Sequence, residues 1–249
     1  MVDATDYARQ WAGLVANVRL FGAHAPRGRV IEIGPMVASL IPSAPESSVM
    51  NVAMAVESRD TPERLEELAD AFREGGANKW GLWARPEDSE GARAAERQGM
   101  VLDSLPAAMV ADLDELPFDE AAACQQPDFA TVGRINDLAY GYDPPKLGPA
   151  IGRLPDTVRT YGASHDGAIG CVAMGYDVGT DTAVWFVATH PQARRRGLAS
   201  EVLKRLLLDA RARGQRTASL QASQAGRPLY ERLGFAGVGT LHLYEQRLR

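Results

Sequence analysis

The chain has 249 residues, of which 45% are hydrophobic and 24% charged, and a formal net charge of −5 at pH 7. These values are typical of a globular protein with one large or two modest domains, and the acidic balance argues against general nucleic-acid binding. The start lacks the pattern of a signal peptide, no apolar run is long enough to span a membrane, and Cys124 and Cys171 are too few for a disulfide framework or a cysteine metal site. We therefore expect a cytoplasmic protein without a metal, a nucleic-acid partner or a membrane partner.

The first half of the chain predicts helices alternating with short strands. Apolar residues recur at helical spacing over residues 5–21. Thr61 and Pro62 suit the start of a second helix, which Gly75 and Gly76 would end. A short third helix is expected at 89–98. Strands are expected at 29–33, 36–41, 48–56 and 79–84, with one or two more at 104–113.

The stretch 116–127 contains two prolines and a short acidic group, and it predicts a boundary between domains 1–117 and 118–249. Beyond it, apolar spacing predicts a helix over residues 132–139, followed by an aromatic, turn-rich loop at 140–145. Strands are expected at 159–164 and 168–176, joined by a hairpin turn, and another at 183–188.

A strand-loop-helix junction follows, with the sequence Arg194-Arg195-Arg196-Gly197-Leu198-Ala199 before a strongly periodic helix. The first amides of a helix lack internal acceptors and the helix dipole adds partial positive charge, so the junction suits an anion such as a pyrophosphate. Between residues 190 and 216 there are eight Lys or Arg residues and two acidic residues. This surplus would attract a polyanion, although solvated surface is the alternative interpretation of these arginines.

Two motifs of the second half together resemble the GNAT superfamily of N-acyltransferases. The junction resembles that family's acyl-CoA pyrophosphate loop, in which a basic residue is followed, after two further residues, by Gly-x-Gly/Ala. After a candidate strand at 218–222, the sequence Leu229-Tyr230-Glu231-Arg232-Leu233-Gly234-Phe235 resembles the family's closing helix. The resemblance covers residues 128–249. It implies an α/β (α+β) fold with a mixed, largely antiparallel central sheet flanked by helices.

The resemblance also implies an activity, which is direct transfer of an acetyl group from acetyl-CoA to an amine in a ternary complex. Tyr230 would be the general acid that protonates the departing thiolate. Ser223 occupies a position where the family often has asparagine, which puts the contacts near the pantetheine in doubt. The residues expected at the acetyl-CoA site are Val187, Thr189, Arg194, Arg195, Arg196, Gly197, Leu198, Ala199 and Ser223.

The acceptor side is less defined by the sequence. The family's first helix and the loop after it shape that site, which implies Tyr140, Tyr142 and Asp143 as its residues. Tyr176, at the end of the strand expected at 168–176, is a further candidate. The general base stays open between Asp143, Tyr176, Asp177 and a water chain, whereas His190 is interpreted as structural. The acceptor would be a small-molecule or peptide amine, and the protein a monomer or a homodimer. A non-catalytic acyl-CoA sensor or interaction protein is the alternative function.

An internal repeat links the two halves. Residues 96–100 match residues 231–235, and the same offset of 135 positions puts Thr61 and Pro62 opposite Arg196 and Gly197. Proline lacks the amide that glycine offers there, and the flanking acidic residues Asp60 and Glu63 would repel phosphate. Ala95 falls opposite Tyr230. We therefore expect two tandem GNAT-like domains, of which the first is a degenerate copy without a CoA loop.

Overall fold

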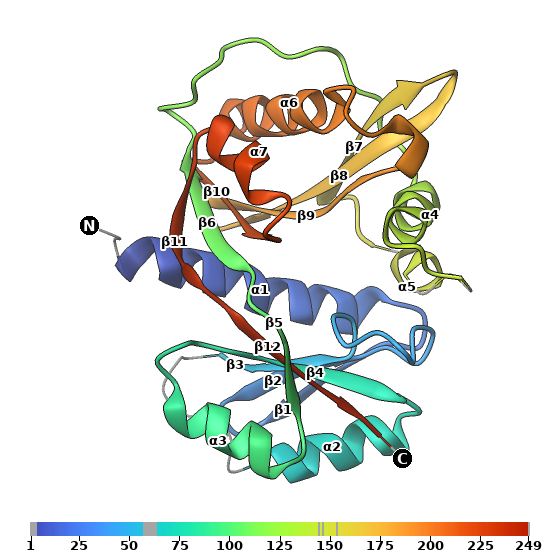
Figure 1. Cartoon of the computed structure of the whole chain (residues 1–249), viewed down its shortest axis with the longest axis vertical. Coiled ribbons are helices and arrows are strands. Elements are labelled where there is room, and N and C mark those ends of the chain that lie inside the picture. The colour runs from blue at the N-terminus through green and yellow to red at the C-terminus, as the bar shows by residue number, and fades with distance from the viewer. Residues whose placement is uncertain (1–3, 57–63, 144, 146, 153, 249) are drawn as a thin grey trace.

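The computed structural model describes residues 4–56, 64–143, 145, 147–152 and 154–248. In this part of the chain the elements form five layers, with helices outside each of two six-stranded sheets and further helices between the sheets (Figure 1). The described helices include none with the length and apolarity needed to cross a membrane.

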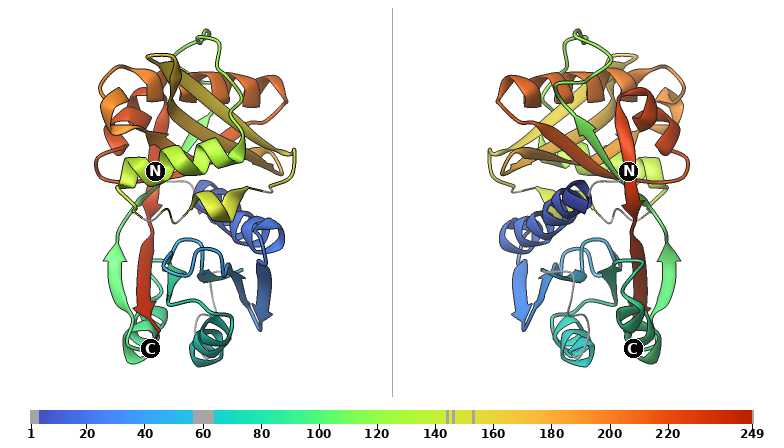
Figure 2. Two further views of the ribbon diagram at one scale, coloured as in Figure 1. Left: turned by 90° about the vertical axis from the view of Figure 1, so that its right-hand side faces the viewer. Right: turned by 90° about the vertical axis from the view of Figure 1, so that its left-hand side faces the viewer.

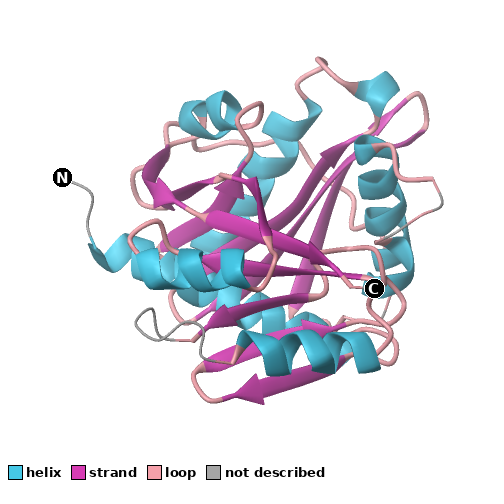
Figure 3. Ribbon diagram, turned by 60° about the horizontal axis from the view of Figure 1, so that its bottom comes forward, coloured by secondary structure: helices cyan, strands magenta, loops and turns pink. Residues whose placement is uncertain are grey.

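The first sheet lies in the lower half of Figure 1 and has the strand order β1-β2-β3-β4-β12-β5. Within it β3 and β4 run parallel, and the other neighbouring strands are antiparallel. The helices α2 (Leu65–Glu74) and α3 (Ser89–Arg97) pack on its outer face, which Figure 3 turns toward the viewer. Its strands are β1 (Arg29–Ile33), β2 (Met36–Leu40), β3 (Val52–Ala55), β4 (Lys79–Ala84), β5 (Val101–Ser104) and β12 (His242–Arg247).

The second sheet has the order β11-β6-β10-β9-β8-β7. Here β9 and β10 are the parallel pair. The helices α6 (Leu198–Ala212) and α7 (Arg227–Arg232) cover one face, and α4 (Phe129–Tyr140) and α5 (Gly148–Ile151) cover the other. Its strands are β6 (Ala107–Asp112), β7 (Val158–His165), β8 (Ala168–Val178), β9 (Asp181–Thr189), β10 (Thr217–Ala222) and β11 (Phe235–Thr240).

The two sheets have the same plan, with one strand exchanged between them. From its other edge the second sheet reads β7-β8-β9-β10-β6-β11, which matches β1-β2-β3-β4-β12-β5 when β6 and β12 trade places. At the offset of 135 positions, the bounds of β6 fall on those of β12. The expected pair of mixed, largely antiparallel sheets flanked by helices is confirmed.

The expected division at residues 117/118 does not coincide with the division between the sheets. β6 precedes that point but pairs with β10 and β11, and β12 follows it but pairs with β4 and β5. The apolar pattern of a segment predicts that it forms a strand but not which strand it pairs with. The exchange of β6 and β12 between the two sheets could therefore not be predicted from either segment. Each half therefore completes the sheet of the other.

The helix α1 (Ala4–His24) lies between the two sheets, as both views of Figure 2 show. Its buried side chains belong to apolar clusters that include residues of each sheet. The Trp11 indole N–H donates to the carbonyl of Ala55 at the end of β3 (3.0 Å), and the Phe21 ring meets that of Phe186 on β9 at 5.7 Å. Burial of each such large apolar side chain contributes roughly 1.5–3 kcal/mol, so α1 is a shared core of both halves.

Most elements expected from the sequence are present, with the following differences. The strand expected at 48–56 is reduced to β3, because Asn51 accepts from the amide of Ile41 (2.7 Å) and donates to the carbonyl of Ala44 (2.7 Å), which holds the preceding residues in turns. The strands β11 and β12 and the helix α5 were not predicted, and β5 lies almost entirely before the strands expected at 104–113. The expected helix start at Thr61 and Pro62 lies outside the described residues.

Candidate active site

The junction between β9 and α6 has a tightly wound backbone. After Thr189 a short 3-10 turn, η1 (Pro191–Ala193), begins where the Nδ1 atom of His190 accepts from the amide of Gln192 at 3.2 Å. Arg195 and Gly197 then both have positive φ, 60° and 78°, before α6 starts at Leu198. A positive φ is favourable for glycine and unfavourable for arginine. The backbone of the loop is therefore relaxed at Gly197 and strained at Arg195.

The backbone amides of this loop are available to bind an anion. Within the described residues, the backbone amides of 195–200 have no hydrogen-bond acceptor. The side chains of Arg195 and Arg196 are exposed, and those of Leu198 and Ala199 pack on the core beneath α6. Free amides at the N-terminus of a 15-residue helix, beside exposed guanidinium groups, fit a phosphate group.

Arg194 has a different environment from the two arginines that follow it. Its Nη2 atom donates to the carbonyl of Ala139 in the last turn of α4 at 2.6 Å, and its Nε atom donates to the carbonyl of Thr189 at 3.4 Å. In Figure 1 the loop before α6 and the helix α4 lie at the same end of the second sheet. The guanidinium of Arg194 is thus engaged with two backbone carbonyls.

The strand β9 leaves β10 part of the way along its length. Its residues Asp181 to Ala183 pair with β10, whereas on its other side it pairs with β8 as far as Thr189. The register with β8 shifts near Phe186, whose φ of 52° is strained for a non-glycine residue and costs of order 1–3 kcal/mol. The edge of β9 at Val187 and Thr189 therefore has no β10 partner within the described residues.

Tyr230 on α7 lies in the core beside this opening. Its side chain is 8% exposed and its ring meets that of Phe235 at 5.8 Å. Burial raises the pKa of Tyr230, with smaller contributions from Tyr140 and Cys171, so the phenol is protonated at neutral pH. In the described part of the chain its hydroxyl makes no hydrogen bond. Ser223 Oγ accepts from the amide of Gly226 at 3.2 Å and fixes the turn that leads into α7.

The expected acceptor residues fall into two places. Tyr140 is 64% exposed at the end of α4, and its ring stacks on that of Tyr142 at 5.8 Å, with the exposed Asp143 next in the chain. Burial raises the pKa of Tyr142, with a further contribution from Tyr140. Tyr176 instead lines a separate cavity of about 570 Å³ between β8 and α1.

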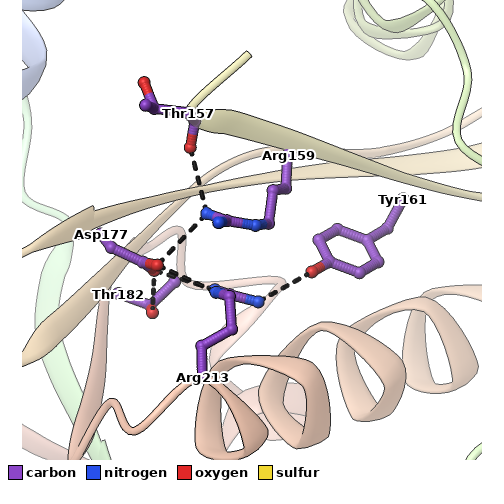
Figure 4. Close-up of polar contacts among 6 residues, drawn as sticks. All are labelled: Thr157, Arg159, Tyr161, Asp177, Thr182 and Arg213. Atoms are coloured by element: carbon purple, nitrogen blue, oxygen red, sulfur yellow. Dashed lines mark hydrogen bonds and ion pairs between the residues drawn. The ribbon is translucent and has the colours of Figure 1, made fainter.

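Asp177, one of the expected candidates for the general base, is held in an ion-pair network (Figure 4). Its carboxylate accepts from Arg213 through two bonds of 2.9 Å, from Arg159 at 3.2 Å and from Thr182 at 2.7 Å. Burial alone would raise the pKa of Asp177, but these hydrogen bonds outweigh it and the pKa is lowered. Arg213 follows the last residue of α6, about 22 Å along the helix from the junction. Asp177 is therefore an ion-pair residue at the end of α6 opposite to the junction.

Two features of the site had no signal in the sequence. The bond from Arg194 to Ala139 joins residues 55 positions apart, and the positive φ of Phe186 occurs inside an ordinary apolar strand. Among the described residues, no group of three or more His, Cys, Asp or Glu side chains is arranged to hold a metal ion.

Comparison with known proteins gives one family match and several structural matches. Residues 156–236 match a family model described as Acetyltransferase (GNAT) domain. No curated protein matches the chain. A GCN5-related N-acetyltransferase from Kribbella flavida has a similar structure, with a TM-score of 0.65, 20% identity, and coverage of 94% of this chain and 95% of that one.

Two further solved structures cover most of the chain. A GNAT-family protein from Novosphingobium aromaticivorans has a TM-score of 0.61 and 18% identity, over 88% of this chain and 92% of that one. A tandem GNAT protein from the clavulanic acid biosynthesis pathway has a TM-score of 0.53 and 16% identity, over 99% of this chain and 96% of that one. The matched region is thus similar to a GNAT acetyltransferase domain. The fold of the whole chain is that of a tandem GNAT protein.

Proposed function

We propose that this protein is an N-acetyltransferase that moves an acetyl group from acetyl-CoA to an amine acceptor within a ternary complex. The observation that carries the proposal is the meeting of three features at one end of the second sheet. Within the part of the chain that the structure describes, these are the free amides of residues 195–200, the unpaired edge of β9 and the buried phenol of Tyr230. The match of residues 156–236 to the GNAT domain model supports the same chemistry.

Acetyl-CoA fits these features part by part. The amides of residues 195–200 and the side chains of Arg195 and Arg196 would hold the pyrophosphate. The edge of β9 at Val187 and Thr189 would bind the amides of the pantetheine arm, as a strand edge binds any extended chain with amide groups. Ser223 would contribute through the turn that it fixes rather than through a free side chain.

The reaction needs one proton donor near the sulfur. The amine nitrogen forms a bond to the thioester carbonyl carbon, the carbon–sulfur bond breaks, and the departing thiolate takes the phenolic proton of Tyr230. The amine loses its surplus proton to water, which later restores the phenol. Tyr230 suits this role because burial keeps its hydroxyl protonated and no partner in the described residues occupies it.

We propose that the two functional units are residues 1–117 and 118–249, and that the first does not bind acetyl-CoA. Its counterpart of the pyrophosphate loop is residues 59–64, of which 59–63 lie outside the described residues. Ala95 is buried in α3 where the second half has Tyr230 in α7. The carbonyl of Ala55 at the end of β3 also accepts a hydrogen bond from Trp11. The strand of the first half that corresponds to β9 is therefore occupied there by a side chain of α1. Its role would be to complete the sheet and to support α4 and α5 through α1.

The acceptor would be a small-molecule or peptide amine that reaches the site past Tyr140 and Tyr142. The test is release of free CoA thiol when the purified protein is incubated with acetyl-CoA and a panel of primary amines and short peptides. Turnover that disappears in the Tyr230→Phe variant would support the proposal. Tight binding of acetyl-CoA without turnover on any amine would favour the non-catalytic acyl-CoA sensor instead.

A further inference from the structure

Three consecutive arginines at the junction differ in what their side chains contact. Arg195 and Arg196 are exposed, and within the described residues their guanidinium groups make no hydrogen bond or ion pair. Arg194 donates to the carbonyls of Ala139 and Thr189. In the sequence the three arginines form one basic cluster. In the structure the side chain of Arg194 is hydrogen-bonded within the protein, whereas those of Arg195 and Arg196 extend into solvent.

The carbonyl of Ala139 is one of the terminal acceptors of α4. The last four carbonyls of a helix have no internal donor and need partners from outside the helix. In α4, the amide of Tyr142 donates to the carbonyl of Asp137 (2.9 Å) and that of Gly141 to the carbonyl of Leu138 (3.3 Å). Arg194 supplies the donor for Ala139, and its positive charge is favourable at a helix C-terminus. The end of α4 is therefore closed by a side chain from the acetyl-CoA loop.

We propose that Arg194 is a positioning residue that ties the acceptor helix α4 to the acetyl-CoA loop, and that it does not bind phosphate through its side chain. This inference rests on the proposed function. Tyr140 directly follows Ala139 and stacks on Tyr142, so a tie at Ala139 fixes the tyrosines of the acceptor side. Occupation of the loop amides by pyrophosphate would hold the loop, and through Arg194 it would steady the end of α4.

The chemistry of the side chain suits this task. A guanidinium group has five N–H donors in a fixed plane, so its Nε and Nη2 atoms reach carbonyls of two different elements at once. A lysine at this position would offer one ammonium group and could serve one carbonyl well. The substitution Arg194→Lys should therefore keep the charge and lose part of the tie.

The experiment compares Arg194→Met and Arg194→Lys with the matched controls Arg195→Met and Arg196→Met. Calorimetry measures acetyl-CoA affinity at two salt concentrations, and hydrogen–deuterium exchange follows residues 138–143 with and without acetyl-CoA. We expect Arg194→Met to speed exchange in that segment about three- to tenfold, the range set by loss of one net hydrogen bond, the one to Ala139. Arg194→Lys should lie between it and the parent protein.

The controls should show the opposite pattern. Arg195→Met and Arg196→Met are expected to weaken acetyl-CoA binding about three- to tenfold, with a smaller salt dependence, and to leave exchange at 138–143 unchanged. Arg194→Met is expected to change the affinity less than threefold. In the parent protein acetyl-CoA should slow exchange at 138–143, and in Arg194→Met this slowing should be lost.

Two results would overturn the inference. One is equal exchange at 138–143 in the parent protein and Arg194→Met, and the other is an affinity loss in Arg194→Met as large as in the two controls. Failure of acetyl-CoA to bind the parent protein would overturn the proposed function. Exchange in the free protein would still decide whether Arg194 holds the end of α4, because that comparison needs no ligand.

Discussion

Substitution of Gly197 by alanine tests two possible reasons for a glycine at this junction, which are the backbone conformation and the approach of a ligand to the loop amides. Gly197 has a φ of 78°, and a Cβ atom built there would meet nothing within 4 Å. The free protein therefore needs glycine for its backbone conformation and not for space. A left-handed conformation costs an alanine about 1–2 kcal/mol, partly offset by the smaller conformational freedom of its unfolded chain, so we expect a net loss of about 1 kcal/mol.

The chain offers a matched control at the other end of α6. Gly214 has a φ of 88°, and a Cβ atom there would also meet nothing within 4 Å. Gly214→Ala should thus lose the same free energy of unfolding as Gly197→Ala, and calorimetric melting should show each Tm lowered by about 2–4 °C. The two variants differ only in which end of the helix they disturb.

Acetyl-CoA affinity should distinguish the pair. A methyl group at residue 197 would project where the phosphate approaches the loop amides, and loss of one charge-assisted hydrogen bond weakens binding by roughly 1.5–3 kcal/mol, or about ten- to a hundredfold in Kd. Gly214→Ala should bind like the parent protein. Equal affinity of both variants and the parent, or equal loss in both, would refute the assignment of the pyrophosphate to this junction.

Three other substitutions test the electrostatics. Tyr230→Phe should lower turnover about a hundredfold or more and leave acetyl-CoA affinity unchanged, and unchanged turnover would remove Tyr230 from the acid role. Asp177→Asn should cost about 2 kcal/mol at pH 7, measured by denaturant unfolding; because the folded pKa of Asp177 is lowered, this cost should shrink as the pH falls through that pKa. Asp181 is buried with hydroxyl partners Thr217 and Ser219, and burial raises its pKa, so its contribution is present at low pH and lost as the pH rises through the folded pKa. Asp181→Asn should therefore be as stable as the parent or more stable at pH 7, with that difference disappearing near pH 4. Unfolding curves check both signs, for Asp181→Asn at pH 7 and pH 4 and for Asp177→Asn at pH 7 and at a pH below 3.8. A cost of Asp177→Asn that does not shrink at the lower pH, or an Asp181→Asn that is less stable than the parent at pH 7, would contradict this reasoning.

The sequence predicted best what depends on neighbours in the chain. The helices α1, α4 and α6 and the hairpin between β7 and β8 follow from apolar spacing and turn residues, and the structure has them within a few positions. The junction at Gly197 was recognised for the same reason, because a helix start after a strand is encoded locally.

Long-range pairing could not be predicted in the same way. The offset of 135 positions indicated a repeat, but nothing in the sequence of β12 states that it pairs with β4 and β5 rather than with the sheet of its own half. The engagement of Arg194 with Ala139 and of Asp177 with Arg213 likewise depends on which elements the fold brings together. From residue type alone, the sequence predicted that Arg194 belongs to a basic cluster and that Asp177 is a candidate general base. In the structure Arg194 instead donates to a backbone carbonyl of α4, and Asp177 forms an ion pair with Arg213.

The most direct test of the account is the stoichiometry of acetyl-CoA binding to the intact chain by isothermal titration calorimetry. We predict one site per chain, with affinity in the micromolar range, because the described loop amides and the open edge of β9 belong to the second half alone. Absence of binding, or two sites per chain, would contradict the central claim that one acetyl-CoA site is formed at the junction of β9 and α6.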